Sequence, residues 1–271
     1  MQFTLDAKTV RYANGGADHD PELPGVVLVH GAGMNRTVWQ LQTRYLAHHG
    51  YRVAALDLPG HGGSDGPPLE SIGEMADWVI DVVAALDLAP AHIVGHSMGT
   101  YLAIEAAARR PELVRSIVLV GTAVAMPVHP ELLDAAANDV VHASRLMTSW
   151  SFGARAHIGS HSTPGMWLLG GSTALLDVSS EGSLEADMAA CNAYEGALLA
   201  AAEVLCPVTL VLGSVDKMTP AKRAVDLAAA FTESHTVVLD GIGHMLAMEA
   251  PNATRNAIIE ALASADAGRV G

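Results

Sequence analysis

The sequence predicts an α/β protein with a mostly parallel central sheet and helices on both faces. Short apolar runs rich in β-branched residues alternate with longer segments in which apolar residues recur at helical spacing. This alternation is typical of parallel strands that are covered on both sides. The chain has 271 residues, half of them hydrophobic, and is therefore long enough to bury the core that such a sheet needs.

The first part of the chain shows the alternation most clearly. Strands are expected at Val26–His30, Val53–Leu58, His92–Gly95 and Ile117–Val120. Helices are expected at Leu41–His49, Ile72–Leu86 and Thr100–Arg109. Each expected helix lies between two expected strands, which is the connection that parallel strands require.

The alternation stops after Gly121 and returns at Pro207. Between them lie Ala-rich segments with expected helices near Glu131–Thr148 and Leu184–Val204. Beyond them we expect strands and helices in turn at Pro207–Gly213, Pro220–Phe231, Thr236–Asp240 and Pro251–Ser264. Because a structureless loop of this length is rare in a compact domain, the sequence predicts a core domain of residues 1–121 and 206–271 and a helical cap of residues 122–205.

The net charge of the chain disfavours several classes of partner. The net charge is −14, from 29 acidic and 15 basic residues, and no cluster of Lys or Arg interrupts the acidic excess. Nucleic acids and anionic membranes are therefore disfavoured. The net charge also argues against a strongly anionic substrate, unless local charge overrides it.

The sequence shows no pattern of a signal peptide, a membrane span or a disulfide framework. The N-terminus lacks the basic and apolar regions of a signal peptide, and no apolar run reaches membrane-spanning length. We therefore expect a cytoplasmic protein without membrane insertion. The two cysteines, Cys191 and Cys206, form no disulfide or metal-binding pattern and are expected to be reduced structural residues.

The pentapeptide Gly95-His96-Ser97-Met98-Gly99 matches the pattern of a nucleophile elbow and lies between an expected strand and an expected helix. Glycines on both sides of Ser97 allow the chain to turn sharply and to expose the serine hydroxyl. The amide of Met98, at the start of the helix, faces the position where an oxyanion forms. The alternative is an ordinary helix start in which Ser97 is only the N-cap.

A nucleophilic serine needs a base, and the base needs a carboxylate that orients it. Among 13 histidines, His244 is chosen because it follows the last expected strand within Gly241-Ile242-Gly243-His244. Asp216 likewise follows a strand, and its alternative role is that of a turn or helix-capping acid. Active sites of parallel sheets form at these carboxyl ends of strands. Ser97, Asp216 and His244 are therefore the predicted catalytic triad.

A second oxyanion donor is expected in His30-Gly31-Ala32-Gly33, which follows the first strand expected in the alternating pattern. The small residues let the backbone approach a substrate oxygen, and the Ala32 amide is the expected donor. His30 itself is expected to be a packed structural histidine.

With these motifs in place, the chain resembles the α/β-hydrolase superfamily, in the branch of esterases and lactonases that carry a helical cap. The resemblance covers nearly the whole chain apart from the cap, and includes Asp57-Leu58-Pro59-Gly60-His61-Gly62-Gly63-Ser64. It implies that this loop, with His61, is a structural part of the site. The chain order Ser97, Asp216, His244 is the order found in that family.

The predicted function is that of a serine hydrolase that cleaves carboxylic esters of small, apolar substrates through an acyl-enzyme. A lactonase or a carbon-carbon bond hydrolase with the same triad remains an alternative, as does a ligand-binding protein that keeps the fold without the chemistry. The partner is then a small ester or lactone, and a homo-oligomer is left open. No cofactor and no metal are expected, because His48, His49, His157 and His161 lack acidic or cysteine partners in a metal-binding pattern.

The cap is expected to determine the substrate. Several of its large apolar residues are candidates for lining an acyl pocket, with packing inside the cap as the alternative. They are Met126, Met147, Met166, Met188, Trp150 and Trp167.

Overall fold

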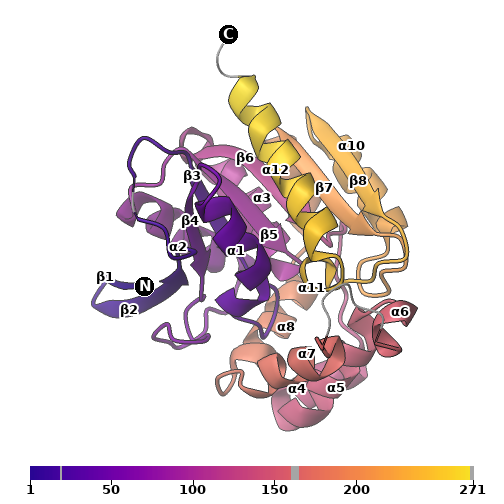
Figure 1. Ribbon diagram of the computed structural model, residues 1–271. Coiled ribbons are helices and arrows are strands. Elements are labelled where there is room, and N and C mark those ends of the chain that lie inside the picture. The colour runs from indigo at the N-terminus through magenta and orange to yellow at the C-terminus, as the bar shows by residue number, and fades with distance from the viewer. Residues whose placement is uncertain (19, 160–164, 269–271) are drawn as a thin grey trace.

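The computed structural model describes residues 1–18, 20–159 and 165–268, and an eight-stranded sheet lies at its centre (Figure 1). The strand order is β1-β2-β4-β3-β5-β6-β7-β8. β1, β2 and β4 pair antiparallel in that order, and every further pair from β4 to β8 is parallel. The strands are β1 (Gln2–Leu5), β2 (Lys8–Ala13), β3 (Gly25–Val29), β4 (Arg52–Leu56), β5 (Ala91–His96), β6 (Val114–Val120), β7 (Val208–Gly213) and β8 (Ser234–Leu239). The predicted mostly parallel sheet is confirmed.

Helices cover both faces of this sheet, as predicted. α1 (Gln40–Ala47) and α12 (Pro251–Ala267) pack together on one face (Figure 1). α2 (Ile72–Ala85) and α3 (Met98–Arg109) pack together on the other face. The shorter helices of this part of the chain are η1 (Arg36–Trp39), η2 (Pro111–Leu113), η3 (Ala221–Ala224), α10 (Val225–Ala230) and α11 (Leu246–Glu249).

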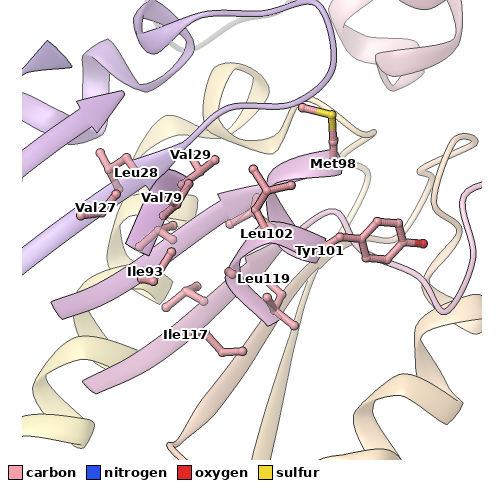
Figure 2. Packing of buried hydrophobic residues seen from close by; sticks show 14 of the residues in the cluster. Val27, Leu28, Val29, Val79, Ile93, Met98, Tyr101, Leu102, Ile117 and Leu119 are labelled. Atoms are coloured by element: carbon pink, nitrogen blue, oxygen red, sulfur yellow. The ribbon is translucent and has the colours of Figure 1, made fainter. Parts of the chain in front are cut away.

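The central strands β3, β5 and β6 are almost entirely buried and mostly apolar, because neither of their faces meets water. Leu28, Ile93 and Leu119 are fully buried, and Leu102 of α3 and Val79 of α2 pack in the same cluster (Figure 2). Burying one such side chain contributes about 1.5–3 kcal/mol. The rigid sheet holds the carboxyl ends of its strands in fixed positions, and the loops that leave those ends form the site described below.

The hairpin of β1 and β2 is absent from the sequence prediction. Its turn consists of Asp6 and Ala7, both in the left-handed region with φ of 49° and 64°. Tight hairpin turns are usually signalled by Asn-Gly or Asp-Gly, and alanine at the second position removes that signal.

A helical insertion connects β6 to β7. Within the described residues it contains α4 (Pro130–Asn138), α5 (Val140–Ser151), α6 (Ala154–His157), α7 (Leu168–Asp177), α8 (Ser183–Ala193) and α9 (Ala197–Ala202). The inserted helical segment predicted from the sequence is confirmed. Its division from the core at residues 122 and 205 stays a prediction, since α9 packs against α3 and α10.

The insertion differs in detail from the prediction. The helix expected over Glu131–Thr148 is two helices, because Asp139 leaves the helical conformation and its side chain accepts a hydrogen bond from the His142 amide at 3.0 Å. The helix expected over Leu184–Val204 is divided at Tyr194, which has extended backbone. α6 and α7 are absent from the prediction.

Candidate active site

Ser97 lies in a strained turn between β5 and α3. Its φ of 51° and ψ of −119° place a non-glycine residue in a sparsely populated backbone region. Its side chain makes no capping hydrogen bond to the helix, which argues against the alternative of a simple N-cap. The residue is partly exposed and lines a cavity, so the turn presents the serine hydroxyl to that cavity.

The glycines of the pentapeptide are required by close backbone packing. A Cβ atom at Gly95 would lie 2.1 Å from the Gly99 carbonyl oxygen, and one at Gly99 would lie 2.6 Å from the Val29 carbonyl oxygen. Neither position therefore accepts a side chain without displacing neighbouring backbone, that of the turn itself at Gly95 and that of the end of β3 at Gly99.

Asp216 and His244 come together at the carboxyl ends of β7 and β8. The His244 Nδ1 lies 2.8 Å from Asp216 Oδ2 and 3.1 Å from the Thr219 hydroxyl. The carboxylate accepts a hydrogen bond, so Nδ1 carries the hydrogen. In the neutral ring this leaves Nε2 as the basic nitrogen.

The Asp216 carboxylate is held by several donors besides His244. Its Oδ1 accepts hydrogen bonds from the Met218 and Thr219 amides, both at 2.8 Å, and its Oδ2 accepts one from the Thr219 hydroxyl at 2.8 Å. Burial alone raises the pKa of Asp216, but the adjacent His244 and these hydrogen bonds outweigh it and hold the pKa well below its usual range. Asp216 is therefore ionised at neutral pH.

His96 connects the serine turn to the histidine loop. Its Nε2 donates to the His244 carbonyl oxygen at 3.0 Å, and the two rings lie 4.9 Å apart between centroids. Burial and then the neighbouring His244 lower the pKa of His96 to about 3, so its ring is neutral. The residue before Ser97 thus holds the backbone of His244 beside the serine turn.

The loop after β3 places Ala32 beside Ser97. A Cβ atom at Gly31 would lie 3.1 Å from the Ser97 Cβ, and Ala32 lines the same cavity as Ser97. The Ala32 amide takes no part in the backbone hydrogen bonds of the described residues. Met98 is the first residue of α3, where amides have no partner within the helix. Two amides are therefore available next to the Ser97 hydroxyl.

His30 and His61 lie side by side, with ring centroids 5.0 Å apart, but they differ in charge. His30 donates from Nδ1 to the Gly31 carbonyl oxygen at 2.8 Å and accepts at Nε2 from the Leu58 amide at 3.2 Å. This pattern requires a neutral ring, and burial, with the neighbouring His61, lowers the pKa of His30 to about 3. His30 thus has the packed, buried position expected from the sequence.

Both ring nitrogens of His61 face acceptors. Nδ1 lies 3.0 Å from the Pro59 carbonyl oxygen and Nε2 lies 2.9 Å from Asp187 Oδ2. Both must donate, so the ring is an imidazolium paired with a carboxylate. Burial opposes this charge, but the Asp187 carboxylate outweighs it and raises the pKa of His61.

Asp187 belongs to α8 of the helical insertion and has no counterpart in the sequence analysis. It is completely buried, and its Oδ2 also accepts a hydrogen bond from the Gly33 amide at 2.8 Å. Gly33 follows Ala32, and its carbonyl oxygen accepts a further hydrogen bond from the Ser179 hydroxyl. The insertion is therefore bonded directly to the loop that carries the Ala32 amide.

A second link joins the insertion to the histidine loop. The carbonyl oxygen of Ser151, at the end of α5, accepts from the His244 amide at 2.6 Å. The Glu249 carboxylate accepts from the Gly153 amide at 2.8 Å and from the Gly243 amide at 3.0 Å. Both links hold His244 against the insertion.

The cavity that Ser97 lines has a volume of about 360 Å³. Of the residues predicted to line an acyl pocket, Met126, Met188 and Trp150 do so. Met147 is instead buried in the packing of the insertion, Met166 is partly buried and does not line this cavity, and Trp167 is 74 % exposed on the surface. The lining residues are Ala32, Ser97, Met126, Pro127, Val128, His129, Leu132, Trp150, Met188, Cys191, Lys217, Met218, Thr219 and Arg223.

Cys191 and Cys206 are both buried, and they form no disulfide with each other. Cys191 lies on the cavity wall, where burial raises the pKa of its thiol, so it is protonated and unreactive at neutral pH. In the part of the chain that the structure describes, no group of three His, Cys, Asp or Glu side chains is placed to hold a metal. His161 lies outside the described residues. No described helix is long and apolar enough to cross a membrane.

The chain belongs to the alpha/beta hydrolase fold family, which matches residues 24–251. It is 25% identical over 268 residues to (E)-2-((N-methylformamido)methylene)succinate hydrolase of Acinetobacter baylyi, an alignment that covers 93% of this chain and 96% of that enzyme. The crystal structure of an enol-lactonase from Burkholderia xenovorans aligns with a TM-score of 0.85, 20% identity and coverage of 97% and 100% of the two chains. A thermophilic esterase aligns with a TM-score of 0.80, 24% identity and coverage of 98% and 97%. These findings establish a fold that serves hydrolases of several substrates.

Proposed function

We propose that the chain is a serine hydrolase that cleaves carboxylic esters of small, largely apolar substrates through an acyl-enzyme on Ser97. The observation that carries the proposal is the tautomer of His244. Its Nδ1 is occupied by Asp216 and Thr219, so Nε2 is left to accept a proton. The strained turn presents the Ser97 hydroxyl to an apolar cavity close by.

The first half of the reaction forms the acyl-enzyme. Ser97 Oγ attacks the ester carbonyl carbon while its proton passes to His244 Nε2. The Ala32 and Met98 amides donate to the oxyanion, each contributing about 3 kcal/mol to transition-state stability. The bond from the carbonyl carbon to the alkoxy oxygen then breaks, and the proton on Nε2 passes to the departing alcohol. Catalytic hydrogen bonds commonly tighten only with substrate, so we expect the contact between Ser97 and His244 to form then.

The second half releases the acid. A water molecule attacks the acyl carbon as its proton passes to His244 Nε2, and the oxyanion forms again at the same two amides. The bond to Ser97 Oγ breaks, and Nε2 returns the proton to the serine. Asp216, ionised throughout, stabilises the imidazolium that forms in each half.

A relative that acts on a methylenesuccinate supports hydrolysis but leaves the bond type open. A lactone is an internal ester, so the same steps open its ring. The test is turnover of p-nitrophenyl esters, lactones of different ring size and vinylogous diketones by the wild type and by Ser97→Ala. We expect the esters to be the best substrates and the variant to lose activity by at least about 10³-fold. A Ser97→Ala variant that keeps the wild-type rate contradicts the proposal. If the wild type turns over diketones faster than esters, carbon-carbon bond hydrolysis becomes the supported function in place of ester hydrolysis.

A further inference from the structure

Two basic side chains, Lys217 and Arg223, line the same cavity as Ser97. No Asp or Glu among the described residues lines it, although the chain has 29 acidic residues against 15 basic ones. Salt screens exposed charges over about 8 Å, so a ligand in the cavity is affected mainly by the charges on its wall. The wall of the cavity thus carries two cationic side chains and no carboxylate within an acidic protein, and the net charge is a poor guide to the substrate.

The two cations sit on the segment that follows Asp216. Lys217 is the next residue, and Arg223 belongs to η3. Both backbone polar groups of Arg223 are hydrogen-bonded. Its amide donates to the Pro220 carbonyl oxygen at 2.7 Å, and its carbonyl oxygen accepts from the Val124 amide at 3.0 Å. Both side chains are exposed, and Lys217 lies between Asp216 and Met218, whose backbone amides are both hydrogen-bonded.

Neither cation is neutralised by a carboxylate in the described structure. Ion pairs there involve other arginines and several histidines. Asp226 lines an adjoining hollow together with Lys222 and Arg223 but forms no ion pair with either of them. Lys217 and Arg223 are therefore free to bind an anion that enters the cavity.

We infer that the ester or lactone cleaved at Ser97 carries a carboxylate, which binds to Lys217 and Arg223. The carbon skeleton lies against the apolar side chains that the insertion contributes to the cavity. The inference rests on the proposed function and narrows its substrate class to small half-esters or lactone acids. The planar fork of Arg223 pairs with both carboxylate oxygens, while Lys217 adds a point charge.

Two matched pairs of esters test the inference from either side of the scissile bond. The p-nitrophenyl half-ester of glutaric acid and p-nitrophenyl pentanoate have acyl chains of equal length and differ in the terminal carboxylate. 4-Acetoxybenzoate and its methyl ester place the same difference on the leaving group. The measured quantity is the ratio of kcat/KM for the anionic ester to kcat/KM for the neutral ester.

The variants are Lys217→Gln, Arg223→Gln and their combination, with Lys222→Gln as the matched control. Lys222 is also exposed and is next in sequence to Arg223, but it does not line the cavity with Ser97. We expect each single variant to lower the ratio in at least one pair by about two- to fivefold, and the double variant by about tenfold. The control should leave both ratios unchanged. Unchanged ratios in the double variant overturn the inference, and an equal loss in Lys222→Gln shows general charge attraction in place of a binding site.

Binding to Ser97→Ala separates this inference from the proposed function. Calorimetry compares monomethyl glutarate with methyl pentanoate, in this variant and in the same variant with Lys217→Gln and Arg223→Gln added. Preferential binding of the anion that the added substitutions remove supports the carboxylate site even if the wild type hydrolyses no ester. Ester turnover without any preference, in rate or in binding, leaves the proposed function standing and contradicts the carboxylate site.

Discussion

The two sides of the cavity are built in different ways. On the sheet side, the turns that follow β5, β7 and β8 carry Ser97, Asp216 and His244 respectively. Close backbone contacts fix the conformation of these turns. On the insertion side, side chains such as Met126 and Trp150, from the loop after β6 and from α5, provide apolar surface. The candidate catalytic groups thus lie on loops at the ends of sheet strands, whereas much of the apolar wall of the cavity comes from the helical insertion and the loop that leads into it.

The insertion is nevertheless bonded to the loops of the site. Asp187 of α8 holds the Gly33 amide and the His61 ring, and the Ser151 carbonyl oxygen holds the His244 amide. A shift of the insertion therefore reaches the Ala32 amide and His244 directly.

The largest effect tests the sheet side. Asp216→Asn keeps the volume of the side chain but places an amide or a neutral oxygen next to His244 Nδ1, so the ring loses its orienting charge. We expect kcat for a short p-nitrophenyl ester to fall by about 10⁴-fold, the effect that the same change has in serine proteases. Circular dichroism checks that the variant is folded. A loss below about tenfold in a folded variant removes Asp216 from the triad.

Asp187→Asn tests the link between the two sides. The variant removes the charge that holds His61 as an imidazolium and loosens the loop that carries Ala32. We expect kcat to fall by about tenfold with a smaller change in KM, because misplacing one donor affects the transition state more than binding. Glu185→Gln is the control, since Glu185 is exposed on the same helix. Equal kinetics in the two variants mean that the link has no role in catalysis.

Stability should depend on pH in opposite senses for the two kinds of buried histidine. His30 and His96 have pKa values lowered from 6.5 to about 3, so the unfolded chain binds more protons between these values. Each then reduces the free energy of unfolding by up to roughly 1.4 kcal/mol per pH unit as the pH falls below 6.5. His61, whose pKa is raised, stabilises below 6.5, and that contribution is lost as the pH rises through its pKa in the folded state.

Urea unfolding between pH 4.5 and 9 measures both effects. We expect the alkaline loss to disappear in Asp187→Asn, and the acid slope to become shallower in His96→Gln. A free energy of unfolding that stays constant between pH 6.5 and 4.5 contradicts the neutral state assigned to His30 and His96.

The smallest effect tests the insertion side. Met126→Ala enlarges the cavity, so we expect KM for short acyl esters to rise by about two- to fivefold and the preference to move toward longer acyl chains, with little change in kcat. Met147→Ala is the control, because Met147 is buried within the insertion and does not line the cavity. It should lower stability by about 2–5 kcal/mol and leave the acyl preference unchanged. If both variants change the acyl-chain preference equally, Met126 does not determine that preference through contact with the acyl chain.

Sequence patterns predicted the sheet side far better than the insertion side. Ser97 and its glycines form a local pattern, because the steric demands of the turn are met by residues adjacent in sequence. Asp216 and His244 could be placed because both follow apolar strands. Thr219 was missed, although a threonine three residues after an acid in a turn is a recognisable capping arrangement.

Asp187 could not be predicted in the same way. It lies 154 residues from Gly33, in a helical segment without a motif, and its role exists only because α8 docks on the loop after β3. The charge of His61 follows from this contact and is equally hidden. Lys217 and Arg223 are ordinary surface residues in the sequence, and only the fold brings them to the cavity that Ser97 lines.

If Ser97 is an activated nucleophile, as proposed, a fluorophosphonate reacts with it covalently. Intact-mass measurement followed by peptide mapping should find one adduct in the wild type, located on Ser97, and none in Ser97→Ala. Much slower labelling of Asp216→Asn would tie the reactivity to the triad. A folded wild-type protein that stays unlabelled, or that carries the label on another residue, contradicts the account and favours a ligand-binding protein built on the hydrolase fold.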